Sequence, residues 1–157
     1  DYSSRLHYTS DWIYENERRG VLKNISQQLG GTKENGAINF MSSHSGSYKQ
    51  LKHNDVMRNK IAQMEKRINR RENFFFIPKE RINDLASIIP HMAIIGFVTS
   101  IEGLDTTHIG FAFYRNNRLT FIHASSIKNR VVIDQQTLSA YTLSQSKCKG
   151  IIVATII

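Results

Sequence analysis

The chain has 157 residues, of which 40% are hydrophobic and 22% charged, a composition typical of a globular protein with one buried core. No apolar run approaches the roughly 20 residues that a membrane-spanning helix needs, so we expect no stable membrane insertion. The net charge of +8 would suit an anionic partner, and the single cysteine excludes an internal disulfide and a cysteine-based metal site.

The first half of the chain is predicted to consist mostly of helices and loops. Residues 9–11 (Thr-Ser-Asp) can cap a helix that runs to about Arg19, before a glycine. The segment 21–29 fits either a helix or a strand. The segment 33–48 is rich in Gly, Ser and Asn, and we expect loops there around a short strand at 38–41.

The clearest helix is predicted from Asn54 to Arg71. Apolar residues recur along it at a spacing of four, three and four positions, which makes one apolar stripe: Met57, Ile61, Met64 and Ile68. Residues 52–72 also carry seven basic and three acidic side chains. Such a face is typical of a solvated helix and would also suit an anionic polymer.

Strands are predicted to dominate the second half. A buried run at 74–77 precedes a helix that starts at Pro78 and ends before Pro90. This helix is expected to bury Ile82, Leu85 and Ile88. Further strands are expected at 92–99, 108–114, 119–124, 131–133 and 151–157, with a short helix at 137–141. The pattern predicts a single α+β domain over 1–157, mostly helical and loop over 1–90 and mostly β, with a largely antiparallel sheet, over 91–157.

A hairpin in this half carries the strongest chemical signal. With Asn116-Asn117 as a two-residue turn, Gly110 pairs with His123, Arg115 with Arg118, and His108 with Ser125. His108 and His123 would then share one face, whereas a loop one residue longer would separate them. Two histidines that converge near strand ends suggest a general base and the group that orients it.

No convincing nucleophile accompanies the two histidines. Cys148 lies between two lysines, late in the chain, and is interpreted as structural. Ser125 and Ser126 are not on a Gly-x-Ser-x-Gly elbow and are better suited as hydrogen-bond partners. Asp105 is expected to cap a turn rather than to complete a zinc site, so we predict neither a metal nor another cofactor.

Four segments, in order along nearly the whole chain, resemble the N-acetylmuramoyl-L-alanine amidase-like family, within the NlpC-type papain-like cysteine amidases. They are RLHYTSDWI (5–13), NFMS (39–42), GLDTTHIG (103–110) and FIHASS (121–126). The resemblance implies a papain-like α+β fold, in which helices precede a mostly antiparallel sheet and which would here be incomplete at its N-terminus. It also implies a thiolate that attacks an amide of peptidoglycan without a metal.

Carried over by residue, the resemblance implies that His108 is the general base and His123 the polar member that fixes its imidazole. The nucleophilic cysteine of the family would precede Asp1, and Cys148 does not match it. Arg5, His7 and Tyr8 are expected to line the substrate cleft. Ser125, beside the histidines, is expected to contact substrate as well.

The sequence therefore predicts a bacterial cell-wall amidase that cuts peptidoglycan or muropeptides, outside the cytoplasm or in the periplasm, without a nucleic-acid partner. The bond would join the muramoyl lactyl group to L-alanine. One alternative is a metal-independent ribonuclease with the two histidines as acid and base and Lys128 on a phosphate. Another is a non-catalytic module that binds an anionic polymer through the basic residues Arg58, Lys60, Arg67, Arg70 and Arg71. The sequence gives no indication of the oligomeric state.

Overall fold

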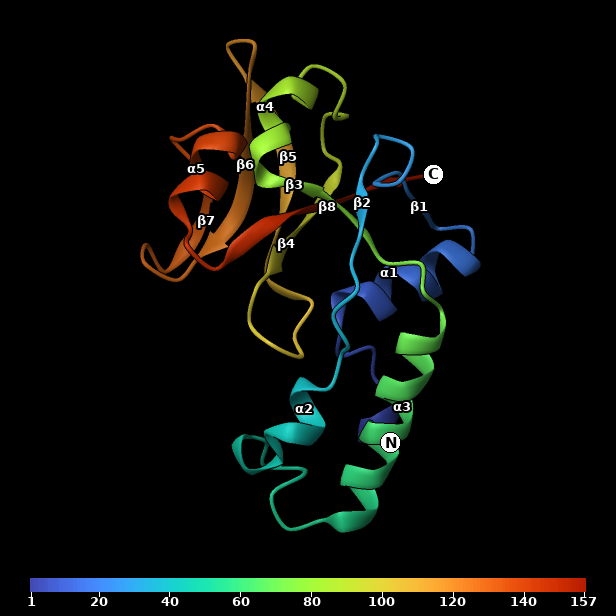
Figure 1. Ribbon diagram of the computed structural model, residues 1–157. Helices are drawn as coiled ribbons and strands as arrows, with labels where there is room; N and C mark the ends of the chain where they lie inside the picture. The colour runs from blue at the N-terminus through green and yellow to red at the C-terminus, as the bar shows by residue number, and fades with distance from the viewer.

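The computed structural model describes all 157 residues as an α+β fold with one antiparallel sheet (Figure 1). Its eight strands are β1 (Leu22–Asn24), β2 (Thr32–Lys33), β3 (Phe75–Pro78), β4 (Ile94–Thr99), β5 (Thr106–Arg115), β6 (Arg118–Ser125), β7 (Arg130–Ile133) and β8 (Cys148–Ile156). The order across the sheet is β2-β3-β8-β4-β5-β6-β7, and β1 pairs with the last residues of β8. The predicted α+β class and the antiparallel sheet are therefore confirmed.

Five α-helices accompany the sheet: α1 (Thr9–Arg18), α2 (Phe40–Ser43), α3 (Asp55–Arg70), α4 (Ile82–Leu85) and α5 (Leu138–Ser144). Side chains cap two of them as their sequences suggest, since Asn54 accepts from the Met57 N–H at 2.9 Å and Thr137 accepts from the Ala140 N–H at 3.1 Å. In Figure 1, α2 and α3 form a lobe at one end, while α4 and α5 lie beside the β5–β7 part of the sheet. No helix has the length and apolar character to cross a membrane.

Three apolar clusters hold these layers together. Alternating residues of the sheet point to opposite faces, so Ile95 and Phe97 pack with α4 and α5 on one face. On the other face, Ile94 and Val98 pack in the cluster that contains Ile13 of α1. The third cluster lies in the lobe, where the predicted stripe of α3 packs on residues of and around α2.

The predicted strand at 38–41 is wrong, because Phe40–Ser43 is helical. Two backbone N–H groups, those of Asn39 and Phe40, donate to the carbonyl of Gly103, and the N–H of Met41 donates to the Tyr8 hydroxyl. These donors are satisfied by groups far away in the sequence, not by a neighbouring strand. Local composition could not indicate such partners.

The predicted helix start at Pro78 is also wrong. Pro78 is the last residue of β3, with φ −54° and ψ 140°, and it pairs with Gly150 of β8. A 3-10 turn (Lys79–Arg81) follows, and α4 ends at Leu85. Because the helical spacing is not continued to residue 88, Ile88 is 55% exposed and the neighbouring Ile89 is buried instead.

The hairpin register agrees with the prediction. The β5–β6 ladder runs from the Arg115–Arg118 pair to the Gly110–His123 pair without an irregularity. Asn116 and Asn117 have φ values of 51° and 59°, as a two-residue turn that matches the twist of the strands requires. This register brings the two predicted site histidines onto one face.

Candidate active site

The two imidazoles of the hairpin contact each other directly. His108 of β5 and His123 of β6 lie with Nε2 and Nδ1 2.7 Å apart, and their rings are perpendicular. His123 is buried, whereas His108 is half-buried. The aromatic rings of Phe97 and Phe121 pack against His108 and His123, respectively. This packing fixes both rings from the side of the core.

A carboxylate that the sequence analysis missed completes the chain of hydrogen bonds. Asp134 follows β7, and its Oδ2 lies 3.1 Å from Nε2 of His123. Its other oxygen, Oδ1, accepts from the backbone N–H of Gln136 at 2.8 Å. The sequence feature that could have indicated Asp134 is its position as a carboxylate directly after a predicted strand. The pairing of His123 with Val132, which brings Asp134 close, depends on a β6–β7 turn whose geometry the sequence does not determine.

These contacts, named here the His108–His123–Asp134 relay, fix where the protons lie. An ionised carboxylate only accepts hydrogen bonds, so His123 carries a proton on Nε2 and donates it to Asp134. Nδ1 of the neutral His123 ring is then an acceptor for the Nε2–H of His108. Nδ1 of His108 keeps a free lone pair, the state from which an imidazole removes a proton.

The surroundings of His108 favour that neutral state. Burial lowers the pKa of His108 below its usual value, and the electrostatic effect of the neighbouring His123 lowers it further. An imidazole that is unprotonated near neutral pH is available as a general base. The relay can therefore accept a proton at one end while Asp134 stabilises the resulting positive charge from the other.

The other predicted site residues lie in two places. Ser125, at the end of β6, shares a face with His123 by strand alternation, and its hydroxyl accepts the backbone N–H of Lys128 at 3.2 Å. His7 lies across the sheet from the relay, in an apolar hollow of about 370 Å³ that Ile109 and Phe111 also line. Its Nε2–H donates to the carbonyl of Tyr2 at 2.8 Å.

Arg5 and Tyr8 flank His7 in different environments. Arg5 is exposed, with its guanidinium 5.6 Å from the centre of the Tyr2 ring. The Tyr8 side chain is buried, donates to Glu65 at 2.7 Å and accepts the Met41 N–H at 2.9 Å. The structure thus brings His108 and His123 into contact and places Ser125 on the same face of β6 as His123. It separates these residues from the segment 5–8.

Cys148 makes no hydrogen bond to either imidazole. It is buried at the start of β8, its thiol points to the carbonyl of Gly150 at 3.5 Å, and burial raises the pKa of the thiol. A buried thiol with a raised pKa is a poor nucleophile. No group of three or more His, Cys, Asp or Glu side chains in the chain is arranged to hold a metal ion.

Comparisons with solved structures give close matches. An N-acetylmuramoyl-L-alanine amidase from Bacteroides uniformis is 32% identical, with a TM-score of 0.87 over 99% of this chain and 66% of that one. A Bacteroides fragilis protein described as a candidate xylanase is also 32% identical, with a TM-score of 0.92 over 99% of this chain and 67% of that one. A Legionella pneumophila protein, 24% identical, shares the fold with a TM-score of 0.71 over 100% of this chain and 64% of that one.

The chain thus spans about two thirds of the length of these solved proteins. The comparison with curated proteins gave no match. A family model described as N-acetylmuramoyl-L-alanine amidase-like matches residues 1–151, nearly the whole chain. The chain therefore belongs to the N-acetylmuramoyl-L-alanine amidase-like family.

Proposed function

We propose that this chain is the histidine-bearing part of a cysteine-type cell-wall amidase with an NlpC-type, papain-like site. The observation that carries the proposal is the relay, in which Nε2 of His108 contacts His123 and Nδ1 of His108 has no hydrogen-bond partner. A base held in one tautomer by a second ring and a carboxylate suits an enzyme that activates a thiol and later protonates an amine. Membership of an amidase-like family supports the same reaction class.

In the proposed mechanism, His108 takes the proton of a cysteine thiol, and the thiolate attacks the amide carbonyl. The imidazolium of His108 then gives its proton to the departing amine, and the C–N bond breaks as a thioester forms. His108 next removes a proton from water, whose oxygen attacks the thioester carbonyl. The C–S bond breaks, and the imidazolium of His108 returns its proton to the departing thiolate. Because Cys148 is buried and turned towards Gly150, the nucleophile is proposed to lie outside residues 1–157.

The proposed substrate is peptidoglycan or a muropeptide, cut between the muramoyl lactyl group and L-alanine, outside the cytoplasm or in the periplasm. The amidase from Bacteroides uniformis, with its similar fold, supports this choice of bond. Ser125 is proposed to contact the substrate near the relay, whereas Arg5 and His7, which lie away from the relay, are proposed to contact a more distant part of the substrate. Tyr8 would contribute only through its backbone, because its side chain is buried and hydrogen-bonded.

The geometry gives less support to three other activities. A ribonuclease needs an acid and a base on either side of a phosphate, whereas these two rings bond to each other. A xylanase needs two carboxyl groups, and the relay supplies one, with both oxygens hydrogen-bonded. For a polymer-binding helix, three of the five candidate cations already pair with acidic residues: Arg58 with Asp55, Lys60 with Asp1, and Arg71 with Asp11.

The proposal is tested by treating the intact protein with a muropeptide analogue that carries a thiol-reactive electrophile. We expect one cysteine other than Cys148 to be labelled, and we expect the labelling rate to fall in His108→Ala. The exposed His53 offers a matched control, and His53→Ala should label like the wild type. Labelling of Cys148, or equal rates in wild type and His108→Ala, would contradict the proposal.

A further inference from the structure

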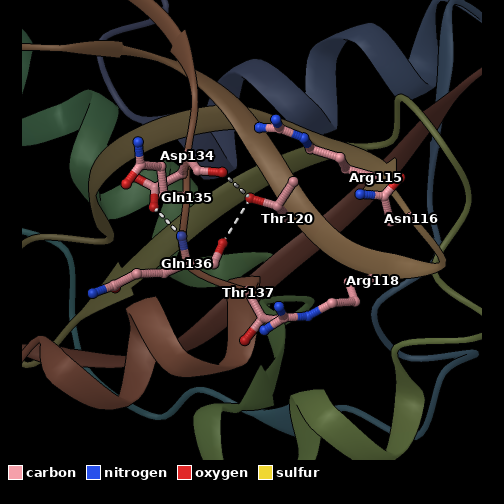
Figure 2. A pocket seen from close by; sticks show the side chains of 8 residues that line it. All are labelled: Arg115, Asn116, Arg118, Thr120, Asp134, Gln135, Gln136 and Thr137. Atoms are coloured by element: carbon pink, nitrogen blue, oxygen red, sulfur yellow. Dashed lines mark hydrogen bonds between the residues drawn. The ribbon is translucent and has the colours of Figure 1, made fainter.

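A polar hollow of about 280 Å³ lies at the turn end of the β5–β6 hairpin, and no apolar residue lines it. Its walls come from the hairpin and from the segment between β7 and α5 (Figure 2). In Figure 2 the guanidinium groups of Arg115 and Arg118 extend from the hairpin on opposite sides of Thr120. The remaining lining residues are Asn116, Asp134, Gln135, Gln136 and Thr137.

The two arginines carry positive charge that no ion pair in the protein neutralises. Arg115 and Arg118 are directly opposite each other in the ladder, a placement that is unfavourable for like charges. Both are exposed, and neither forms a salt bridge. A negative group between them would remove this repulsion.

Asp134, the acidic residue of the hollow, is already occupied. Its Oδ2 accepts from His123 and its Oδ1 from the Gln136 N–H. The Thr120 hydroxyl is likewise held inward, 2.9 Å from the Asp134 carbonyl and 2.7 Å from the Gln136 carbonyl. The groups left to a ligand are mainly donors, namely two guanidinium forks and three side-chain amides.

We propose that this hollow is a binding site for an oxyanion, which the guanidinium groups of Arg115 and Arg118 hold from two sides. Planar guanidinium forks match the paired oxygens of a carboxylate or a phosphate. The oxyanion is a carboxylate of the peptide in a muropeptide, a role that rests on the proposed amidase function, or free inorganic phosphate.

The position of the hollow indicates how it acts on a substrate. Arg118 lies five positions before His123 along β6, about 16 Å at the usual rise of a strand. Asp134 of the relay lines the same hollow, but a group held by the two guanidiniums is separated from the base His108 by Asp134 and His123. We expect such a group to be held equally before and during the reaction. Such binding lowers KM and leaves kcat unchanged.

The test uses NMR signals of the arginine side chains and of the side-chain amides that line the hollow, which remain in every variant. The probes are inorganic phosphate and a muropeptide with free carboxylates. We expect either probe to shift Arg115 and Arg118, and Arg115→Gln/Arg118→Gln to weaken its binding by at least roughly tenfold. The exposed Arg130, which does not line the hollow, gives the matched control Arg130→Gln, with unchanged binding. A muropeptide whose carboxylates are amidated distinguishes the two oxyanions. If the site binds the substrate carboxylate, amidation should abolish muropeptide binding, whereas the binding of inorganic phosphate does not depend on it.

Equal affinities in wild type and Arg115→Gln/Arg118→Gln, or equal weakening in Arg130→Gln, would overturn the site. Melting temperatures establish that each variant is folded. Failure of the amidase proposal would be distinct, because phosphate would still shift both arginines in a protein that cuts no muropeptide. If muropeptides are cut and their carboxylates are bound, the double variant should raise KM with little change in kcat.

Discussion

Two buried polar networks of this protein differ in one respect. In the lobe, the Tyr8 hydroxyl donates to Glu65 and accepts from the Met41 N–H, and Glu65 also accepts the Ser42 N–H. In the sheet, the relay runs from Asp134 through His123 to His108. Both join side chains from different elements of the fold, and both have a carboxylate as the acceptor.

The difference lies at the ends of the two networks. The network around Tyr8 is enclosed, with Tyr8 and Glu65 each 2% exposed. The relay ends on a half-buried ring whose Nδ1 has no partner. A buried network with every group satisfied stabilises the fold, whereas one that leaves a lone pair accessible can do chemistry. The comparison predicts that mutations in the first network affect stability and mutations in the second affect activity.

The largest effect is expected for His108→Ala. Removing a general base costs typically about 10²- to 10⁴-fold in rate, so kcat/KM for muropeptide hydrolysis by the intact protein should fall by that order. The melting temperature should change little, because His108 is half-buried at the end of the relay. Steady-state kinetics and thermal unfolding provide the two measurements. A variant that unfolds but keeps its activity per folded molecule would reverse the assignment.

Glu65→Leu should give the opposite result. The substitution leaves the Ser42 N–H and the Tyr8 hydroxyl proton without acceptors in the lobe. We expect the free energy of unfolding to fall by about 2–4 kcal/mol, since each buried unsatisfied group costs about 1–3 kcal/mol. Urea unfolding measures the loss, and activity per folded molecule should be retained. Lost activity with unchanged stability would show that this network belongs to the site.

Asp134→Asn tests the inner end of the relay. A hydrogen bond to a charged group contributes about 1.5–3 kcal/mol, so we expect kcat to fall roughly 10- to 100-fold. KM should change little if Asp134 acts only through His123. The KM and kcat of Glu80→Gln, an exposed carboxylate elsewhere, serve as the control. A change in KM alone would assign Asp134 to substrate binding.

The smallest effect concerns pH and stability. The folded-state pKa of His108 is lowered below its ordinary value of 6.5, so the unfolded chain takes up this proton more readily than the native protein. The contribution of His108 to the free energy of unfolding is therefore fully present above pH 6.5 and is lost as the pH falls from that value through the lowered folded-state pKa. Urea unfolding at about pH 7.5 and about pH 5.5 measures how much free energy of unfolding is lost between the two conditions. This loss should be smaller in His108→Gln than in the wild type. His53→Gln should behave like the wild type.

The sequence was sufficient for the elements that local rules determine. The turn preference of Asn116-Asn117 and the alternation on both sides of it predicted the register that joins His108 to His123. The spacing of the apolar stripe predicted α3, which the Asn54 side chain caps. In these cases the partners are close in sequence, or the pattern repeats several times.

Other features depend on contacts between distant segments. Asn39 and Phe40 are held by Gly103, so a segment that looked like a strand forms α2. Asp134 reaches His123 through the β6–β7 register, where Asn129 adopts a φ of 50° that its sequence context did not indicate. The sequence therefore predicted two members of the relay and missed the third, which determines the direction of its protons.

The central claim, that Asp134 fixes His108 with a bare Nδ1, can be measured directly. Nitrogen NMR of the imidazole rings distinguishes a protonated ring nitrogen from one with a free lone pair. At neutral pH we predict protonated Nε2 in both His108 and His123, and unprotonated Nδ1 in both. A proton on Nδ1 of His108, with Nε2 bare, would contradict the relay and remove the base on which the proposed function depends.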